Sequence, residues 1–535
     1  MRRLIILAYA AASTHGKKAV IGFDIGTESV RAGLFDAQSG ELLATKSHPH
    51  ETRFPQPGYA EQSPAAWWDG MGEACRAVVQ ECADVDVVAI CLAATSCTVV
   101  ACQEDGAPLR DCLLWMDQRA AAESDEILRL GAGDAALNVN AQGKGPISAE
   151  WMLPKALWLK KHEREIYDAA SVICECQDWL NHKCTGTWVA GGCNVATRWH
   201  CDGKAACEEV VEGRFGGRPS ELLRRCGLEA LEEKWPRTCV AMGQPAGTLT
   251  KAAATHLGLK EGTPVSQGGA DAFVGLVGLG TATRGGVGVI TGSSSLHLAV
   301  APAPSKGPPK GAPGVWGPYR GAPLMDLAMS EGGQSTTGAA LQWARRIFGG
   351  DVSFDELEAE AQKLPVGAEG CAALETFQGA RTPETDPKAR GALYGLTLKH
   401  GRGHIWRALL EATALGTRAS VDALTQGSEA KEDLALSGGA TRSKLWLQMH
   451  ADACGRDVII GESAEAPLLG CAVLASALAG VHPSISEAVE AMVRPARRIK
   501  PDSKSAKAFD ALYDRVYRHG FSALKPLSHR TSTDA

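Results

Sequence analysis

The sequence predicts an α/β protein composed of two related lobes that face each other across a central cleft. Its 535 residues exceed what one hydrophobic core supports, because single cores stop growing at about 250–300 residues. Residues 19–35 and 287–300 each contain two short apolar runs, which flank a turn of glycine and polar side chains. This repeated pattern is a weak internal duplication, which is typical of a protein with two related halves.

The composition indicates a globular protein with neither a nucleic-acid nor a membrane partner. Hydrophobic residues make up 45% of the chain and charged residues 22%, the usual balance for a soluble protein. The net charge of −6 gives no basic field for nucleic acid. No apolar run approaches the roughly 20 residues that a membrane span requires.

The 17 cysteines include no C-x₂-C pair, so we expect mostly buried thiols in a reducing compartment, the cytoplasm. Cys193, His200, Cys201 and Cys207 form the densest group, but their spacing matches no common zinc site. Residues 1–14 place two arginines before a short apolar run. This segment resembles an organelle-targeting or signal sequence, and a frayed cytosolic N-terminus fits it equally well.

The N-terminal lobe opens with a predicted β-hairpin whose connecting turn carries the polar groups. Its strands are residues 19–23 and 30–35. Gly26 has no Cβ, so a phosphate can approach the backbone and accept hydrogen bonds from its N–H groups. Asp24, at the end of a strand, is placed to hold Mg²⁺ or to face a polar substrate. An ordinary hairpin turn has the same composition, so this motif alone is a weak indication.

The next segments alternate between strands and helices. Ser63 as N-cap and Pro64 at the first position predict the start of a helix. A hydroxyl-rich cluster around Ser96 lies between two apolar strands and is either a turn or a place where hydroxyls meet a ligand. Residues 193–233 look irregular and polar, and we expect them to form an excursion on the surface. The expected strands are residues 41–48, 85–92 and 99–102, and the expected helices are residues 67–82, 151–162 and 175–186.

Two segments of this lobe carry side chains suited to a sugar substrate. Trp115 and Asp117 end a strand-like run, where an indole can pack on a sugar C–H face and a carboxylate can accept hydroxyl protons. A helix start capped by Asp117 fits the same residues. Asp271 follows a short strand with two glycines and precedes a predicted helix at residues 273–279, so a substrate can approach its carboxylate. Taken alone, this pattern favours a structural N-cap.

The C-terminal lobe repeats the opening pattern at Thr291, Gly292 and Ser293. Two such turns that meet across a cleft would cradle a polyphosphate from both sides. Gly438 and Gly439 follow a predicted strand and precede a helix. This pattern would let an adenine or ribose pack against the bare backbone, and a plain βα turn has the same pattern. Elsewhere we expect a surface loop at 302–323, an irregular stretch at 377–396, helices at 331–348, 404–424, 443–454 and 468–478, and strands at 434–437 and 458–461.

Seven short motifs, spread over residues 19–500, agree with one another in order and spacing. They are Asp24-Ile25-Gly26-Thr27, Trp115-Met116-Asp117, Gly269-Ala270-Asp271, Thr291-Gly292-Ser293-Ser294, Glu331-Gly332-Gly333-Gln334, Phe377 to Pro383 and Leu436 to Ala440. Together they resemble the FGGY-type carbohydrate kinases, which share the fold of actin, hexokinase and the heat-shock ATPases. Within that family, residues 115–120, 177–183 and 381–383 are most similar to the ribulokinase-like pentulose kinases and depart from the glycerol kinase pattern.

The resemblance implies two actin/hexokinase-like (ribonuclease H-like) ATPase lobes. It also implies an enzyme that uses ATP and Mg²⁺ to phosphorylate the terminal hydroxyl of a pentulose, with D-ribulose favoured. The alternatives are a kinase for L-ribulose, xylulose or ribitol, and a catalytically silent sugar-sensing protein of the same fold. The implied partners are a small ketopentose and ATP, and a homodimer is compatible with them. The implied domains are an N-terminal extension (1–18), an N-terminal lobe on the sugar side (19–284), a C-terminal lobe on the adenosine side (285–500), and a C-terminal helix and tail (501–535).

The resemblance further implies roles for single residues. Asp271 would be the catalytic base and would contact the sugar, and Asp24 would hold Mg²⁺ and orient the sugar. The other sugar-side residues would be Ser96, Trp115, Asp117 and Asp178. The nucleotide would be bound by Gly26, Thr27, Ser29, Thr291, Gly292, Ser293, Gln334, Gly438, Gly439, Ala440 and Ser443.

Overall fold

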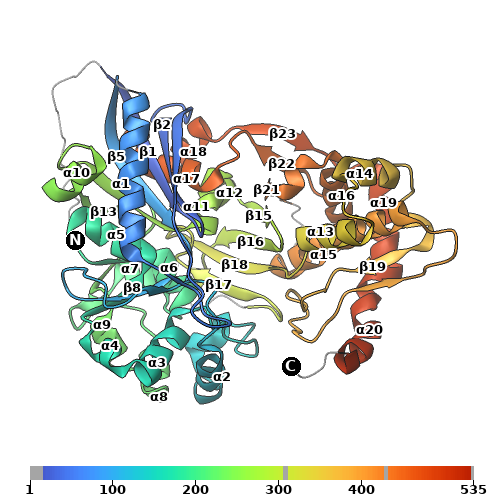
Figure 1. Ribbon diagram of the computed structural model, residues 1–535, viewed down its shortest axis with the longest axis horizontal. Coiled ribbons are helices and arrows are strands. Elements are labelled where there is room, and N and C mark those ends of the chain that lie inside the picture. The colour runs from blue at the N-terminus through green and yellow to red at the C-terminus, as the bar shows by residue number, and fades with distance from the viewer. Residues whose placement is uncertain (1–15, 83, 305–310, 427–431, 532–535) are drawn as a thin grey trace.

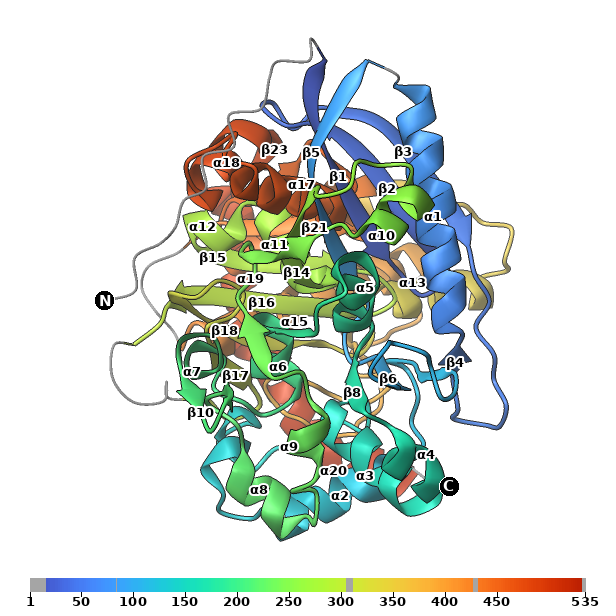
Figure 2. The ribbon, with the colours of Figure 1, turned by 90° about the vertical axis from the view of Figure 1, so that its left-hand side faces the viewer.

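The computed structural model describes residues 16–82, 84–304, 311–426 and 432–531, and the predicted targeting segment at residues 1–14 lies outside them. Two lobes lie side by side, each built around a mixed β-sheet with helices on its faces (Figures 1 and 2). This arrangement confirms the predicted α/β class. Within the described ranges, no helix combines the length and apolar character that a membrane crossing needs.

The sheet of the N-terminal lobe begins with the hairpin that the sequence predicts. In sheet order, its six strands are β13 (Pro245–Thr248), β14 (Pro264–Ala270), β5 (Val85–Ala94), β1 (Lys17–Ile25), β2 (Ser29–Asp36) and β3 (Leu42–Pro49). β1, β2 and β3 are antiparallel neighbours, whereas β14, β5 and β1 run parallel. One face packs against α1 (Pro64–Glu81), α5 (Cys176–Thr185) and α10 (Lys251–Leu257). The start of α1 at Pro64, after Ser63, confirms the predicted helix start.

A smaller sheet completes this lobe below the first one. Its strands, in order, are β4 (Glu61–Gln62), β7 (Cys112–Leu113), β6 (Val99–Cys102) and β8 (Val172–Glu175). A separate apolar core joins it to α2 (Ala121–Leu130), α3 (Met152–His162) and α4 (Arg164–Ala169).

The stretch at residues 193–233 is not a surface excursion. It contains two buried aromatic side chains, Trp199 and Phe215, that belong to the core of the smaller sheet. Some of its polar side chains also find partners inside the protein, such as His200, whose Nε2 lies 3.1 Å from Oδ1 of Asn140. Its elements are α6 (Gly192–Arg198), α7 (Gly203–Glu208), β10 (Val210–Val211), β11 (Arg214–Phe215), α8 (Ser220–Arg225) and α9 (Leu231–Lys234).

The C-terminal lobe repeats the strand order of the first sheet. Its seven strands, in order, are β17 (Trp316–Arg320), β18 (Leu327–Gln334), β16 (Ser295–Pro302), β15 (Gly286–Thr291), β21 (Leu434–Gly438), β22 (Val458–Gly461) and β23 (Pro495–Ile499). β18, β16 and β15 are antiparallel neighbours, and β15, β21 and β22 run parallel. The main helices of its core are α13 (Gly338–Ile347), α14 (Phe354–Gln362), α15 (Arg402–Leu424), α16 (Lys444–Cys454) and α19 (Ser503–Leu512).

Two of the sequence-based expectations for this lobe are wrong in detail. Residues 331–334 end strand β18 instead of opening a helix, because the helix begins only at Gly338. The expected loop at 302–323 contains strand β17, whose Tyr319 is buried in the core. Local turn signals from proline and glycine concealed an edge strand, where proline is tolerated.

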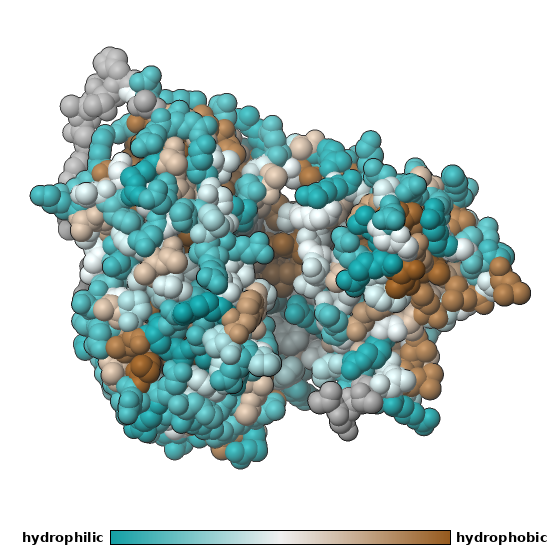
Figure 3. Space-filling model, viewed as in Figure 1, coloured by the Kyte–Doolittle hydropathy of each residue, from teal (hydrophilic) through white to brown (hydrophobic). Residues whose placement is uncertain are grey.

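Two helices join the lobes in the middle of the molecule (Figure 1). α11 (Asp271–Gly278) follows β14, and α17 (Ala466–Leu478) follows β22. They cross closely: a Cβ on Gly278 would lie 2.0 Å from the carbonyl oxygen of Ala466, and one on Gly470 would lie 2.2 Å from that of Val274. α17 also packs against β1 and β5, so one apolar core spans both lobes. The surface is hollowed between the lobes on the face shown in Figure 3.

Candidate active site

Three of the expected site residues lie at one edge of the N-terminal sheet. β1, β5 and β14 are parallel, and their register pairs Asp24 with Ala93 and Ala270 with Ala94. Asp24, Ser96 and Asp271 therefore all occur at or just after the carboxyl ends of neighbouring strands. This edge is where ligands bind in open α/β sheets.

Asp24 is buried and keeps one carboxylate oxygen free. Its Oδ2 accepts a hydrogen bond from Arg31, which also donates to Glu465 just before α17. Its Oδ1 has no hydrogen-bond partner among the described residues. Burial raises the pKa of Asp24, and the adjacent Arg31 guanidinium opposes that shift. Through these contacts, Arg31 joins the hairpin of the N-terminal lobe to the start of helix α17.

Asp271 is the first residue of α11 and is partly exposed. Its Oδ1 accepts a hydrogen bond from the N–H of Ala272 at 2.6 Å. Burial, followed by the negative charge of Asp24, raises the pKa of this carboxyl to about 7. Arg31 and Arg198 lie near enough to oppose the shift. A carboxylate with such a pKa can accept a proton near neutral pH.

Arg198, at the end of α6, was missed by the sequence reasoning. It is 6% exposed, donates from Nε to Oγ of Ser96 at 3.0 Å, and donates from Nη1 to Oε2 of Glu331 at 2.9 Å. Glu331 lies on β18, so this arginine links the two lobes. The nearby Cys193, Trp199 and Cys201 could have indicated that this segment is buried, because cysteine and tryptophan are seldom left on the surface. A buried segment would have drawn attention to its arginine.

A cavity of about 260 Å³ lies beside this link, between the lobes. Trp151 and Arg198 line it from the N-terminal lobe, and Trp316, Glu331 and Arg381 line it from the C-terminal lobe. Aromatic faces together with charged hydrogen-bonding groups suit a small polyhydroxylated molecule.

Trp115 lies next to the first turn. Its side chain is 36% exposed, and its Nε1 donates to Oγ1 of Thr27 at 2.9 Å. The contact brings a predicted sugar-side residue and a predicted phosphate-side residue together, although they are far apart in the sequence.

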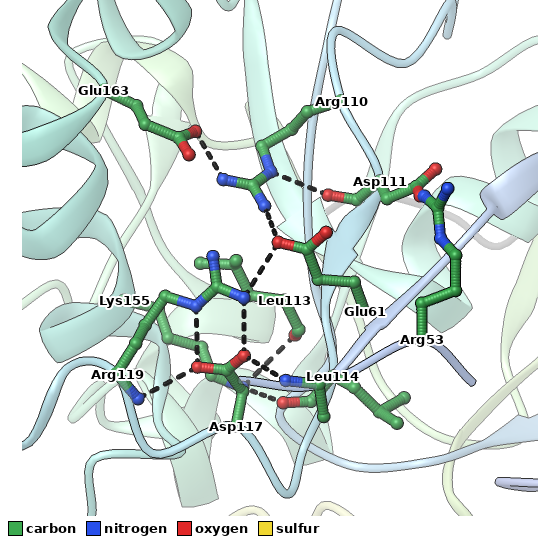
Figure 4. A network of polar contacts seen from close by, with 11 residues as sticks. Arg53, Glu61, Arg110, Asp111, Leu113, Leu114, Asp117, Arg119, Lys155 and Glu163 are labelled. Atoms are coloured by element: carbon green, nitrogen blue, oxygen red, sulfur yellow. Dashed lines mark hydrogen bonds and ion pairs between the residues drawn. The ribbon is translucent and has the colours of Figure 1, made fainter. Parts of the chain in front are cut away.

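Asp117 is paired with neighbouring residues inside the protein (Figure 4). It is fully buried, and its carboxylate accepts hydrogen bonds from Arg119 at 2.7 and 2.8 Å and from the N–H of Ala60 at 2.6 Å. Arg119 in turn donates to Glu61 at 2.8 Å. These partners occupy the carboxylate, so the expected contact between Asp117 and a sugar is corrected to a structural role.

Asp178 is corrected in the same way. It is fully buried in the first turn of α5, where Oδ2 accepts from the N–H of Glu175 at 3.1 Å and Oδ1 accepts from the N–H of Gly191 at 2.9 Å. Burial and the nearby charge of Glu175 raise its pKa to about 8. It caps a helix start instead of facing a substrate.

Three turns of the C-terminal lobe meet at the matching edge of its sheet. Oγ1 of Thr291 donates to the carbonyl of Ser437 at 2.7 Å and accepts from the N–H of Ala440 at 3.0 Å. The N–H of Gly338, at the start of α13, donates to the carbonyl of Gly292 at 3.1 Å. The predicted nucleotide residues from two distant segments therefore form one continuous surface.

Several glycines at these turns are not required by the fold. Gly26, Gly292 and Gly439 all have ordinary φ angles. A Cβ at the first two would have one neighbour each, at 3.6 Å, and a Cβ at Gly439 would have none within 4 Å. By contrast, Gly438 has φ +87°, and its Cβ would lie 1.9 Å from the carbonyl oxygen of Thr291. The open space over the first three glycines leaves their backbone accessible to a ligand.

Two further residues predicted to bind the nucleotide have structural roles here. The amide of Gln334 is buried, donates to Glu375 and to the carbonyl of Thr413 at 3.1 Å, and accepts from Thr417 at 3.1 Å. Gln334 is therefore corrected to a link between β18 and α15. Ser443 is the N-cap of α16, and its Oγ accepts from the N–H of Trp446 at 3.0 Å.

The comparisons with known proteins agree with this geometry. The N-terminal and C-terminal domains of the FGGY family of carbohydrate kinases match residues 19–278 and 287–479. This chain belongs to that family.

The relatives extend over nearly the full length of the chain. An "FGGY carbohydrate kinase domain-containing protein" of Xenopus laevis is 29% identical, over 92% of this chain and 94% of the relative. A ribulokinase of Geobacillus thermodenitrificans is 29% identical, over 93% of each. A xylulose kinase from Rhodospirillum rubrum, known from its crystal structure, is 28% identical in sequence. The two structures superpose with a TM-score of 0.81, over 96% of this chain and all of that one. The predicted two-lobed kinase fold is confirmed.

Proposed function

We propose that this FGGY kinase transfers the γ-phosphoryl group of ATP to the terminal hydroxyl of a pentulose, with D-ribulose as the favoured acceptor. The observation that carries the proposal is Asp271: a partly exposed carboxylate at a helix start, beside Asp24, with a pKa raised to about 7. A carboxylate poised in this way can remove the proton from a sugar hydroxyl while that oxygen attacks phosphorus.

The chain's own residues divide the work between the lobes. Ser96, Arg198 and Trp115 would bind and orient the sugar, and Asp271 would accept the proton from its terminal oxygen. The turns at 26–29, 291–293 and 438–440 would hold the nucleotide through backbone N–H groups and hydroxyls. Closure of the two lobes would exclude water and thereby limit hydrolysis of ATP.

The donor set at Asp24 fits a magnesium ion. Its Oδ1 is buried without a partner in the described part of the chain, and Mg²⁺ is usually held by one or two carboxylates together with substrate phosphates. No group of three or more histidine, cysteine or acidic side chains able to hold a metal occurs in the part of the chain that the structure describes, and this mode of binding needs none. When bound, the ion neutralises the charge of the phosphates during transfer.

The choice of D-ribulose rests on the resemblance of residues 115–120, 177–183 and 381–383 to ribulokinase-like enzymes and on the ribulokinase relative. The xylulose kinase structure supports a second candidate, D-xylulose. The sixteen cysteines other than Cys454 are free thiols, which supports the cytoplasmic location that forms part of this proposal. The homodimer stays a prediction.

A coupled assay of ADP release tests the proposal on D-ribulose, L-ribulose, D-xylulose and ribitol, each against a sugar-free control. We expect the largest kcat/KM with D-ribulose, and phosphorus–proton NMR of the product should place the phosphate on the terminal carbon. A larger kcat/KM with another acceptor would correct the substrate. Binding of a sugar without any ADP release above the control would support the sensor alternative instead.

A further inference from the structure

The backbone N–H and carbonyl of Cys97 are each held by a buried charged group. Its N–H donates to Oε2 of Glu175 at 3.0 Å, and its carbonyl accepts from Nζ of Lys155 at 2.7 Å. Cys97 has φ +64°, a backbone conformation that a residue with a Cβ adopts only under constraint. These two contacts supply that constraint, and the residue that they fix directly follows Ser96.

Glu175 holds a second segment with its other oxygen. Its Oε1 accepts from Nε1 of Trp199 at 2.8 Å, and Trp199 directly follows Arg198. Since Arg198 donates to Ser96 at 3.0 Å, the contacts form a closed loop. One carboxylate thus contacts the residue that follows each partner of the Ser96–Arg198 hydrogen bond: the backbone N–H of Cys97 and the indole of Trp199.

Lys155 joins the same turn to the segment that carries Trp115. Besides the carbonyl of Cys97, its ammonium group donates to the carbonyls of Leu113 at 3.2 Å and Leu114 at 2.7 Å (Figure 4). Trp115 is the next residue in the sequence, and its Nε1 donates to Oγ1 of Thr27 at 2.9 Å. A lysine in the first turn of α3 therefore sets the distance between two chain segments that both reach the cleft.

Neither charged group reaches the cavity itself. Glu175 and Lys155 are both fully buried, and burial of a charge is costly unless hydrogen bonds compensate it. An apolar pair of the same size would fill this space at lower cost, but it would leave the donors and acceptors of three segments unpaired. Both charged groups contact the same segment, the turn after Ser96.

We propose that Glu175 and Lys155 are positioning residues that hold Ser96, Arg198 and Trp115 in the arrangement that the phosphoryl acceptor requires. This inference rests on the proposed function, because that proposal assigns these three side chains to the sugar. It differs from a purely structural role in what it predicts: loss of either charge changes recognition of the sugar more than it changes ATP binding or folding.

The first test replaces Glu175 with glutamine. Both carboxylate oxygens accept N–H groups, whereas an amide has one acceptor and would place its NH₂ against a donor. We expect the KM for the best pentulose to rise by roughly 10- to 100-fold, since a misplacement of about 1 Å has effects of this size. The KM for ATP should change little. Glu123→Gln is the matched control, because Glu123 is a buried carboxylate of the same lobe whose partners are His162 and Lys161.

The second test replaces Lys155 with methionine, which preserves length but removes the ammonium donor that the carbonyls of Cys97, Leu113 and Leu114 share. We expect a rise in sugar KM and a lower melting temperature. Lys160→Met is the control on the same helix, because the partner of Lys160 among the described residues is the carbonyl of Gly227. Kinetic constants are referred to the folded fraction, measured by titration with ATP. A lower melting temperature with an unchanged sugar KM in both variants would overturn the inference.

A crystal structure of Glu175→Gln separates this inference from the proposed function. If the wild-type protein phosphorylates none of the four acceptors, the proposed function fails. The position of Arg198 then decides the inference: a displaced Ser96–Arg198 pair supports it, and a pair retained at 3.0 Å overturns it.

Discussion

The two lobes share a topology but differ in the chemistry at their strand ends. In sheet order, β3-β2-β1-β5-β14 of one lobe corresponds to β18-β16-β15-β21-β22 of the other. At the carboxyl ends the N-terminal lobe carries the charged groups Asp24 and Asp271, with Arg31 beside Asp24, whereas the C-terminal lobe carries Thr291 and backbone. Under the proposed function, the comparison teaches that one scaffold would serve proton and metal chemistry on one side and neutral recognition on the other. Four predictions test this division, from the largest expected effect to the smallest.

Replacement of Asp271 with asparagine should have the largest effect. Asparagine keeps the shape of the side chain but cannot take a proton, so we expect kcat to fall about 10²- to 10⁴-fold, the usual contribution of a general base. ATP binding, measured by calorimetry, should be nearly unchanged. Near-normal turnover would show that another group is the base and would break the assignment of proton transfer to the N-terminal lobe.

Replacement of Asp24 with asparagine should raise the Mg²⁺ concentration needed for half-maximal activity about 10- to 100-fold, because it removes the anionic ligand. The measurement is a titration of initial rate against Mg²⁺ at saturating ATP and sugar. Its control is Asp36→Asn, another buried aspartate of the same hairpin, which accepts hydrogen bonds from the N–H groups of Gln38 and Ser39. Equal Mg²⁺ dependence in both variants would contradict the role of Asp24.

Replacement of Gly439 with valine tests the C-terminal lobe. Since nothing in the described structure lies within 4 Å of the new Cβ, the fold should tolerate it, and a ligand that approaches the backbone should be hindered. We expect the KM for ATP to rise about tenfold, equivalent to about 1.4 kcal/mol, with the KM for sugar unchanged. Gly438→Ala is the contrast: it should lower the melting temperature, because φ is +87° and its Cβ would meet Thr291 at 1.9 Å. An unchanged KM for ATP in the valine variant would place the nucleotide elsewhere.

The pH profile should show the smallest effect. The base must be deprotonated to act, and the pKa of Asp271 is raised to about 7, so kcat/KM should fall as the pH drops through 7 and level off above it. Between pH 7 and pH 6 the loss is about fivefold for a single group with this pKa. In Asp24→Asn the like charge is gone, so the midpoint should move to lower pH. A flat profile from pH 6 to pH 8 would exclude Asp271 as a base that titrates there.

The elements that the sequence predicted well depend on short stretches of chain. The hairpin around Asp24, the helix start at Asp271 and the turn at Gly438 and Gly439 each follow from a strand, its glycines and the next few residues. Their motifs and order also suffice to place the chain among the FGGY carbohydrate kinases. Local pattern and motif order thus determined the fold, the family and the two carboxylates.

Only the tertiary structure decided which polar side chains face the cleft. Asp117 and Asp178 lie in motifs that suggested contact with a substrate. Their carboxylates instead accept hydrogen bonds from Arg119 and from backbone N–H groups. Arg198 lies in a stretch that looked irregular, yet it reaches Glu331, 133 residues further along the chain. The reason is physical: whether a charge is buried and paired or faces a ligand depends on partners from distant segments, and no local pattern records them.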